Sequence, residues 1–212
     1  RPYKIIKSGE VRIGVIGVML ESLKSSSLPQ NVRDIKVIEA AGPVQKYADS
    51  LENRVDLTVV LSHQGFQPDS VLATRLEKVD AIIGGHSHTW LAKPVEVNDI
   101  LICQVGSRGE RLGVLDALVD TVDNSIINYN YEYIRTIVGK VEPDPAVKKV
   151  VDSLDSRVAA QMDQKIGVLK TAWDRTAGES NIGNWFTDAL REHFATDVAF
   201  QNSGGIRKDL PA

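Results

Sequence analysis

The sequence predicts a layered α/β domain that begins near the first residue, and three observations predict it. Short apolar runs alternate with stretches of helical spacing from residue 1 to about residue 119. The apolar runs are rich in β-branched residues, which is typical of buried strands. Two further runs, 101–105 and 112–119, are separated by only a short loop and indicate a hairpin. Strands alternating with helices and then a hairpin favour a mixed sheet with helices packed on it.

The elements expected in this domain follow in chain order. The predicted strands are 11–18, 55–61, 80–83, 101–105 and 112–119, and the predicted helices are 40–53 and 69–78. The single cysteine, Cys103, excludes an internal disulfide and lies in an apolar run, so we expect a buried strand thiol.

A second region begins after residue 142. Asp144 suits an N-cap and Pro145 suits a first helical turn, and apolar residues then keep helical spacing as far as Met162. We expect a linker helix within 143–166, after the first domain at 1–142. The remaining residues, 167–212, are expected to form the start of a second, α+β domain with a helix from Ile182 and a strand at 198–200. Trp185 and Phe186 are expected in its core.

Composition excludes several classes of protein. Hydrophobic residues make up 42% of the chain and charged residues 25%, which excludes disordered and fibrous proteins. The formal net charge is −3 and the basic residues are scattered, so no nucleic acid polymer is expected as a partner. No run approaches the roughly 18 apolar residues of a membrane span, so no membrane segment is expected in this chain. The sequence predicts no particular oligomeric state.

Three of the four histidines follow predicted strands, which is the strongest chemical signal in the sequence. His63 follows one strand directly, and His86 and His88 follow the next within Gly-Gly-His-Ser-His. Loops at the carboxyl ends of neighbouring parallel strands converge, so these imidazoles are candidate metal ligands in one crevice. The alternative is that His63 is a lone polar residue and that the pair caps a loop. Asp56 and Asp80 precede the histidines and are not assigned as ligands.

The sequence resembles the 5′-nucleotidase family in five motifs and in the order in which they occur. The motifs are 11–18, Leu-Ser-His-Gln-Gly at 61–65, the run ending in Gly-Gly-His-Ser-His-Thr at 80–89, Glu-Ser-Asn-Ile-Gly-Asn-Trp at 179–185 and Asn-Ser-Gly-Gly-Ile-Arg at 202–207. The resemblance implies a metallophosphatase-type α/β sandwich, present in part, and a nucleotide-binding C-terminal domain. It implies hydrolysis of phosphate esters by water activated at two divalent metal ions, of which Zn or Mn are favoured.

The same resemblance assigns site residues. His63 and His86 would belong to one metal site and His88 to the other, whereas Asn202 and Arg207 would hold the nucleotide. Gly204 and Gly205 would let the backbone approach the ligand, and Arg175 is a further candidate although its spacing to the next motif is one residue too long.

Other motifs of the family do not occur in this sequence. No histidine follows an aspartate two positions earlier, and no asparagine is followed by histidine. We therefore expect both ends to be truncated, no acid/base histidine in this chain, and no activity from these residues alone. The whole protein would be a nucleotide-degrading hydrolase that is periplasmic, extracellular or at the cell surface. The alternatives are a 2′,3′-cyclic phosphodiesterase, another hydrolase of the superfamily such as a thiosulfohydrolase, or a catalytically dead binding module.

Overall fold

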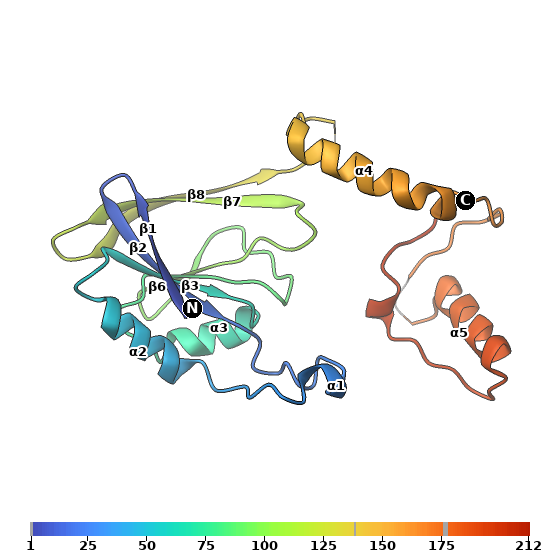
Figure 1. Cartoon of the computed structure of the whole chain (residues 1–212), viewed down its shortest axis with the longest axis horizontal. Helices are drawn as coiled ribbons and strands as arrows, with labels where there is room; N and C mark the ends of the chain where they lie inside the picture. Colours follow the sequence, from blue (N-terminus) through green and yellow to red (C-terminus); the bar gives the residue numbers. More distant parts are fainter. Residues whose placement is uncertain (1, 138, 176–177) are drawn as a thin grey trace. The chain divides into compact units, whose positions relative to one another are not determined.

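The computed structural model describes residues 2–137, 139–175 and 178–212. The chain divides into two compact units, Arg1–Glu142 and Pro143–Ala212, and each is described by itself. Figure 1 shows the course of the chain through both units.

A mixed sheet forms the centre of the first unit, as the sequence predicts. Its strand order among the described residues is β1-β2-β3-β4-β6-β5. The strands are β1 (Tyr3–Ser8), β2 (Val11–Val18), β3 (Leu57–Ser62), β4 (Ala81–Ile83), β5 (Val95–Val97) and β6 (Ile100–Cys103). Neighbours among β2, β3, β4 and β6 are parallel, whereas β1 and β5 add antiparallel edges. The carboxyl ends of β3 and β4 therefore lie side by side.

Helices α2 (Ala41–Leu51) and α3 (Phe66–Ala73) cover one face of this sheet, and a short helix α1 (Pro29–Val32) precedes them. The core on this face joins Ile16, Val60 and Ile82 of the sheet to Val44 and Leu51 of α2. Every one of these side chains is at most 2% exposed. Packing of apolar helix faces on a buried parallel sheet thus fixes the strands that carry the histidines.

Helix α3 begins earlier and ends earlier than the predicted 69–78. Gly65, with φ of 105°, precedes its first residue and turns the chain into it. At the other end, the Asn98 side chain donates to the carbonyl oxygens of Ala73 at 3.3 Å and Leu76 at 2.8 Å. These bonds satisfy carbonyl groups that a longer helix would have used internally, so the helix stops at Ala73.

The predicted hairpin between 101–105 and 112–119 is wrong. Strand β6 is already paired on both sides, by β4 and β5, so no edge remains for a third partner. Strand β7 (Arg111–Asp120) instead pairs with β8 (Ser125–Arg135) in a separate antiparallel sheet. The sequence does signal β8, because tyrosines alternate with polar residues from 128 to 133.

The second unit contains α4 (Pro145–Met162) and α5 (Asn181–Phe194). The predicted start of α4 is confirmed, because the Asp144 side chain accepts from the amides of Ala146 and Val147 at 2.9 and 3.0 Å. Ser180 caps α5 in the same way, with its Oγ accepting from the Gly183 amide.

Two expectations for the second unit are wrong. Residues 198–200 form no strand, because no neighbouring strand pairs with them within the described residues. Trp185 and Phe186 are not in a core, since they are 54% and 37% exposed. The Trp185 ring contacts that of Trp173, with 5.2 Å between ring centroids.

None of the helices in the described ranges is long and apolar enough to cross a membrane.

Candidate metal centre

His63 and His86 lie together at the carboxyl ends of two adjacent parallel strands. His63 follows the last residue of β3, and its backbone amide donates to the Val18 carbonyl at 3.0 Å. His86 follows β4 after Gly84 and Gly85. The two imidazole rings meet edge to face, with centroids 5.2 Å apart and an angle of 66° between their planes. His63 and His86 are both exposed, so their ring nitrogens are accessible.

The backbone of the second loop is turned by the histidines and not by its glycines. His86 has φ of 69° and His88 has φ of 56°, values in the left-handed region that few non-glycine residues adopt. Gly84 and Gly85 are needed for close approach instead. A Cβ at Gly85 would lie 3.1 Å from His63 Nδ1, and one at Gly84 would lie 2.6 Å from Asp69 Oδ2. The two loops can come together only because these side chains are missing.

Each of the two loops is supported by hydrogen bonds to a buried polar side chain, and the sequence interpretation missed this polar network. Ser62 Oγ donates to Asp69 Oδ1 at 2.5 Å and accepts from the Gln64 amide at 3.2 Å. On the other loop, Ser87 Oγ donates to Gln104 Oε1 at 3.1 Å and accepts from the Phe66 amide at 3.0 Å.

Two members of this network are almost inaccessible to solvent. Asp69 is 0% exposed and Gln104 is 2% exposed. Burial raises the pKa of the Asp69 carboxyl, and the hydrogen bond from Ser62 opposes that shift. A polar residue one helical turn after a histidine loop was the available sequence signal, although most such residues are solvated.

The donor atoms present suit part of a divalent metal site. Imidazole is a ligand for Zn and related ions, and 5.2 Å between two accessible rings allows both to face one ion. No group of three or more His, Cys, Asp or Glu side chains is placed to hold a metal ion within residues 2–137, 139–175 and 178–212. His88 lies in the same loop as His86 but outside the ring contact. The described residues therefore fit as contributors to a metal centre and do not complete one.

Asp56 and Asp80 lie at the opposite end of the strands from the histidines. Asp56 forms an ion pair with Arg12 at 2.7 Å, and the hydrogen bond from Arg12 holds the pKa of Asp56 below its usual range. Asp80 Oδ2 accepts from the Thr58 amide at 2.7 Å. Neither carboxylate is therefore placed to join the histidines, in agreement with the sequence interpretation.

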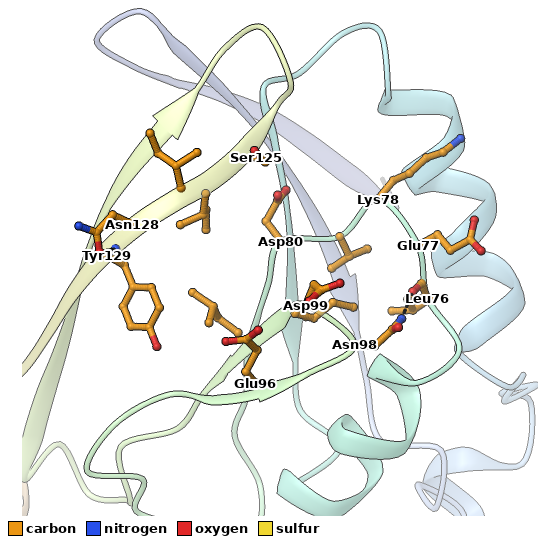
Figure 2. A pocket seen from close by; sticks show the side chains of 15 residues that line it. Leu76, Glu77, Lys78, Asp80, Glu96, Asn98, Asp99, Ser125, Asn128 and Tyr129 are labelled. Carbon is orange, nitrogen blue, oxygen red and sulfur yellow. Dashed lines mark hydrogen bonds between the residues drawn. The ribbon is translucent and has the colours of Figure 1, made fainter.

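Asp80 lines a cavity of about 680 Å³ between the sheet and the β7–β8 hairpin (Figure 2). Glu77, Lys78, Glu96 and Asp99 line the same cavity. Burial raises the pKa of Asp80 to about 6, and the Thr58 hydrogen bond opposes the shift.

Asp80→Asn is therefore expected to remove the free-energy cost of holding an ionised carboxylate at this position in the folded state. The folded state of the unsubstituted chain binds a proton at Asp80 more tightly than the unfolded state, so stability falls as pH rises from about 4 to about 6 and stays lower above that. The amide keeps an acceptor for the Thr58 amide and never ionises. We expect the variant to be more stable at pH 7.5, by up to about 3 kcal/mol, and equally stable at pH 4. Urea titrations of both chains at the two pH values measure this, and parallel pH profiles would contradict it.

In the second unit, two of the predicted nucleotide-binding residues lie near each other. Arg175 and Gly204 line a common cavity of about 560 Å³, together with Asp174, Ser203 and Asp209. Gly204 and Gly205 form a 3₁₀ turn that begins after Asn202.

Arg175 is held by protein groups, which changes how it would act. Its Nε donates to Asp209 Oδ1 at 3.1 Å and its Nη1 donates to the Ile206 carbonyl at 3.0 Å. These bonds fix the segment that carries Arg207, so Arg175 supports the turn whether or not it touches a ligand.

Residues 158–212 match the model of the C-terminal domain of 5′-nucleotidases. The resemblance to the 5′-nucleotidase family is confirmed. Among solved structures, a 5′-nucleotidase precursor from Thermus thermophilus matches 99% of this chain and 46% of its own length, with a TM-score of 0.81 and 27% identity. The fold is therefore of the 5′-nucleotidase metallophosphatase type.

Two curated relatives match almost the whole of this chain. The chain is 27% identical to an apyrase from Tabanus yao, over 97% of this chain and 43% of the apyrase. It is also 27% identical to the endonuclease YhcR of Bacillus subtilis, over 98% of this chain and 18% of that protein. The chain thus spans less than half the length of these relatives.

Proposed function

We propose that these residues belong to a hydrolase that removes phosphate from nucleotides with the help of two divalent metal ions. The observation that carries the proposal is the His63–His86 pair, which lies where two parallel strands end in a fold of the 5′-nucleotidase type. Within the described residues, the ring contact of each imidazole is with the other, and both rings stay accessible at this edge. The comparisons give no support to a cyclic phosphodiesterase or a dead module.

The chain's own residues have separate tasks in this proposal. His63 and His86 would hold one ion, and His88 would bind the second. When bound, the two ions would activate water and neutralise charge on the phosphate. Zn or Mn suits imidazole together with oxygen donors. The remaining donors of a complete centre are not found among the described residues.

The second unit would bind the nucleoside part of the substrate. Asn202 and Arg207 would donate hydrogen bonds, and the planar guanidinium of Arg207 suits a ribose hydroxyl or an anion. Gly204 and Gly205 would allow the backbone to approach, and Arg175 would hold the turn in place through Asp209. A nucleotide or related phosphate ester is thus the proposed partner. By its similarity to snake venom 5′-nucleotidases, we also propose a location outside the cytoplasm.

The decisive experiment measures phosphate release from AMP by the whole protein with added Zn²⁺ or Mn²⁺. We expect turnover that a chelator abolishes and that the metal restores. Arg207→Ala is expected to raise the KM for AMP much more than the KM for p-nitrophenyl phosphate, because the small ester has no nucleoside to bind.

Two results would contradict this proposal. Turnover unaffected by a chelator would remove the metal role of the histidines. Equal losses on AMP and p-nitrophenyl phosphate would show that Arg207 acts at the phosphate or in the fold and not at the nucleoside.

A further inference from the structure

Asp69 is an acidic residue buried in the first turn of α3, beneath the two histidine loops. It is 0% exposed, and its Oδ1 accepts a hydrogen bond from Ser62 Oγ at 2.5 Å. Its Oδ2 is buried without a partner within the described part of the chain. A buried polar atom left unsatisfied costs on the order of 1–3 kcal/mol, so its presence calls for a physical reason.

The carboxyl group lies between the two loops that carry His63 and His86. Through Oδ1 it holds Ser62, the residue directly before His63. Its Oδ2 lies close to Gly84 in the other loop, because a Cβ added at that glycine would be only 2.6 Å from this oxygen. One oxygen of the carboxyl group is therefore bonded to the His63 loop, and the other fills the space beside Gly84 in the His86 loop.

The other side of the second loop is restrained independently. Ser87, the residue after His86, bonds Gln104 Oε1 and accepts from the Phe66 amide at the start of α3. His86 is thus fixed from both sides by groups that belong to α3 or to the segment after β6. Of the side chains that contact the His86 loop, Asp69 is the one that also has a hydrogen bond to the His63 loop, through Ser62.

We infer that Asp69 is a positioning residue that sets the spacing of His63 and His86 for metal binding. The role in metal binding rests on the proposed function, whereas the spacing of the two rings is a property of the metal-free chain. Groups that orient metal ligands from behind typically change metal affinity by about 10- to 100-fold when they are removed. Asp69 touches neither the substrate nor an imidazole, so it acts through the loops.

The test compares the metal-free chain with three variants by NMR, which reports whether the two imidazole rings are close. Asp69→Ala is expected to abolish the nuclear Overhauser effect between the ring protons of His63 and His86. Asp69→Asn is expected to keep it, because the amide has the same size and still accepts from Ser62. The matched control is Asp80→Ala, which removes a partly buried, hydrogen-bonded carboxyl from the same unit at the far end of the strands. It should leave the ring contact unchanged.

Zn²⁺ affinity, measured by competition with a chromophoric chelator, gives a second readout. Asp69→Ala is expected to weaken Zn²⁺ binding by about tenfold or more, and Asp69→Asn by much less. If the whole protein and its variants bind no Zn²⁺ while Asp69→Ala still separates the rings, the proposed metal function fails and the positioning role stands.

The inference is overturned if the ring contact survives in Asp69→Ala, is absent from the unsubstituted chain, or is lost equally in Asp80→Ala. If Asp69→Ala does not fold, Gly84→Ala decides. Its new methyl would press on Oδ2 from the other loop and should displace His86 from His63. An unchanged ring contact in that variant would equally overturn the inference.

Discussion

His86→Ala in the whole protein is expected to lower the turnover of AMP by about a hundredfold or more, the scale at which one preorganised electrostatic group contributes to catalysis. The physical reason is that His86 supplies half of the imidazole pair at the end of β3 and β4. Without it, His63 alone would face the ion, and affinity for the metal should fall together with turnover. Phosphate release at saturating metal, and metal content after dialysis, measure the two effects separately.

The control for this experiment is His193→Ala. His193 is also an exposed histidine, but it lies in the last turn of α5 and its ring contacts Phe194 at 4.7 Å between centroids. We expect turnover and metal content close to those of the unsubstituted protein. Equal losses in both variants, or full turnover in His86→Ala, would contradict the placement of the metal at the strand ends.

Ile82→Ala is expected to have the largest effect on stability. Ile82 is the middle residue of β4, is 0% exposed and belongs to the core between the sheet and its helices. Removing its side chain leaves a cavity that the parallel strands on either side cannot fill, at a cost of about 3–4 kcal/mol in the free energy of unfolding. For a unit of this size we expect the melting temperature to fall by about 10 °C.

Ile83→Ala is the matched control, because the same change is made one residue along the strand. Ile83 points to the other face of the sheet and is 36% exposed. We expect it to cost much less than Ile82→Ala in urea titrations followed by circular dichroism. Similar losses at the two positions would mean that the second face of β4 is as well packed as the first.

Local sequence patterns predicted the elements whose bounds are set by their own residues. Strand β2 begins and ends where the apolar run 11–18 does, and α4 begins at Pro145 after its aspartate cap. The sequence did not predict which strands pair with each other. The partner of a strand depends on which edges are already occupied, and the runs 101–105 and 112–119 are close in sequence yet lie in different sheets. The shifted bounds of α3 likewise depend on Asn98, a residue distant in sequence.

The sequence predicted the histidines of the candidate site and their position after the strands, but not the groups that support them. Histidines after strands are visible in sequence, and the convergence of parallel strand ends brings His63 and His86 together. The reason for the two glycines was not visible, because it is the approach of Asp69 and His63 from other segments. The hydrogen bonds of Ser62, Asp69 and Gln104 were not predicted, because the fold creates the burial of these side chains and most polar residues after a histidine loop are solvated.

Cys103 gives the chain a built-in reporter of strand opening. It lies in β6, paired on both sides, is 5% exposed, and burial raises the pKa of its thiol to about 11. The thiolate is the form that attacks an alkylating reagent, so we expect modification of this buried thiol while β6 has left the sheet. Because the chain has no other cysteine, the rate of alkylation reports on those openings alone. Since the Gly84 amide donates to the Cys103 carbonyl at 2.8 Å, the same rate reports how often the His86 loop loses its anchor.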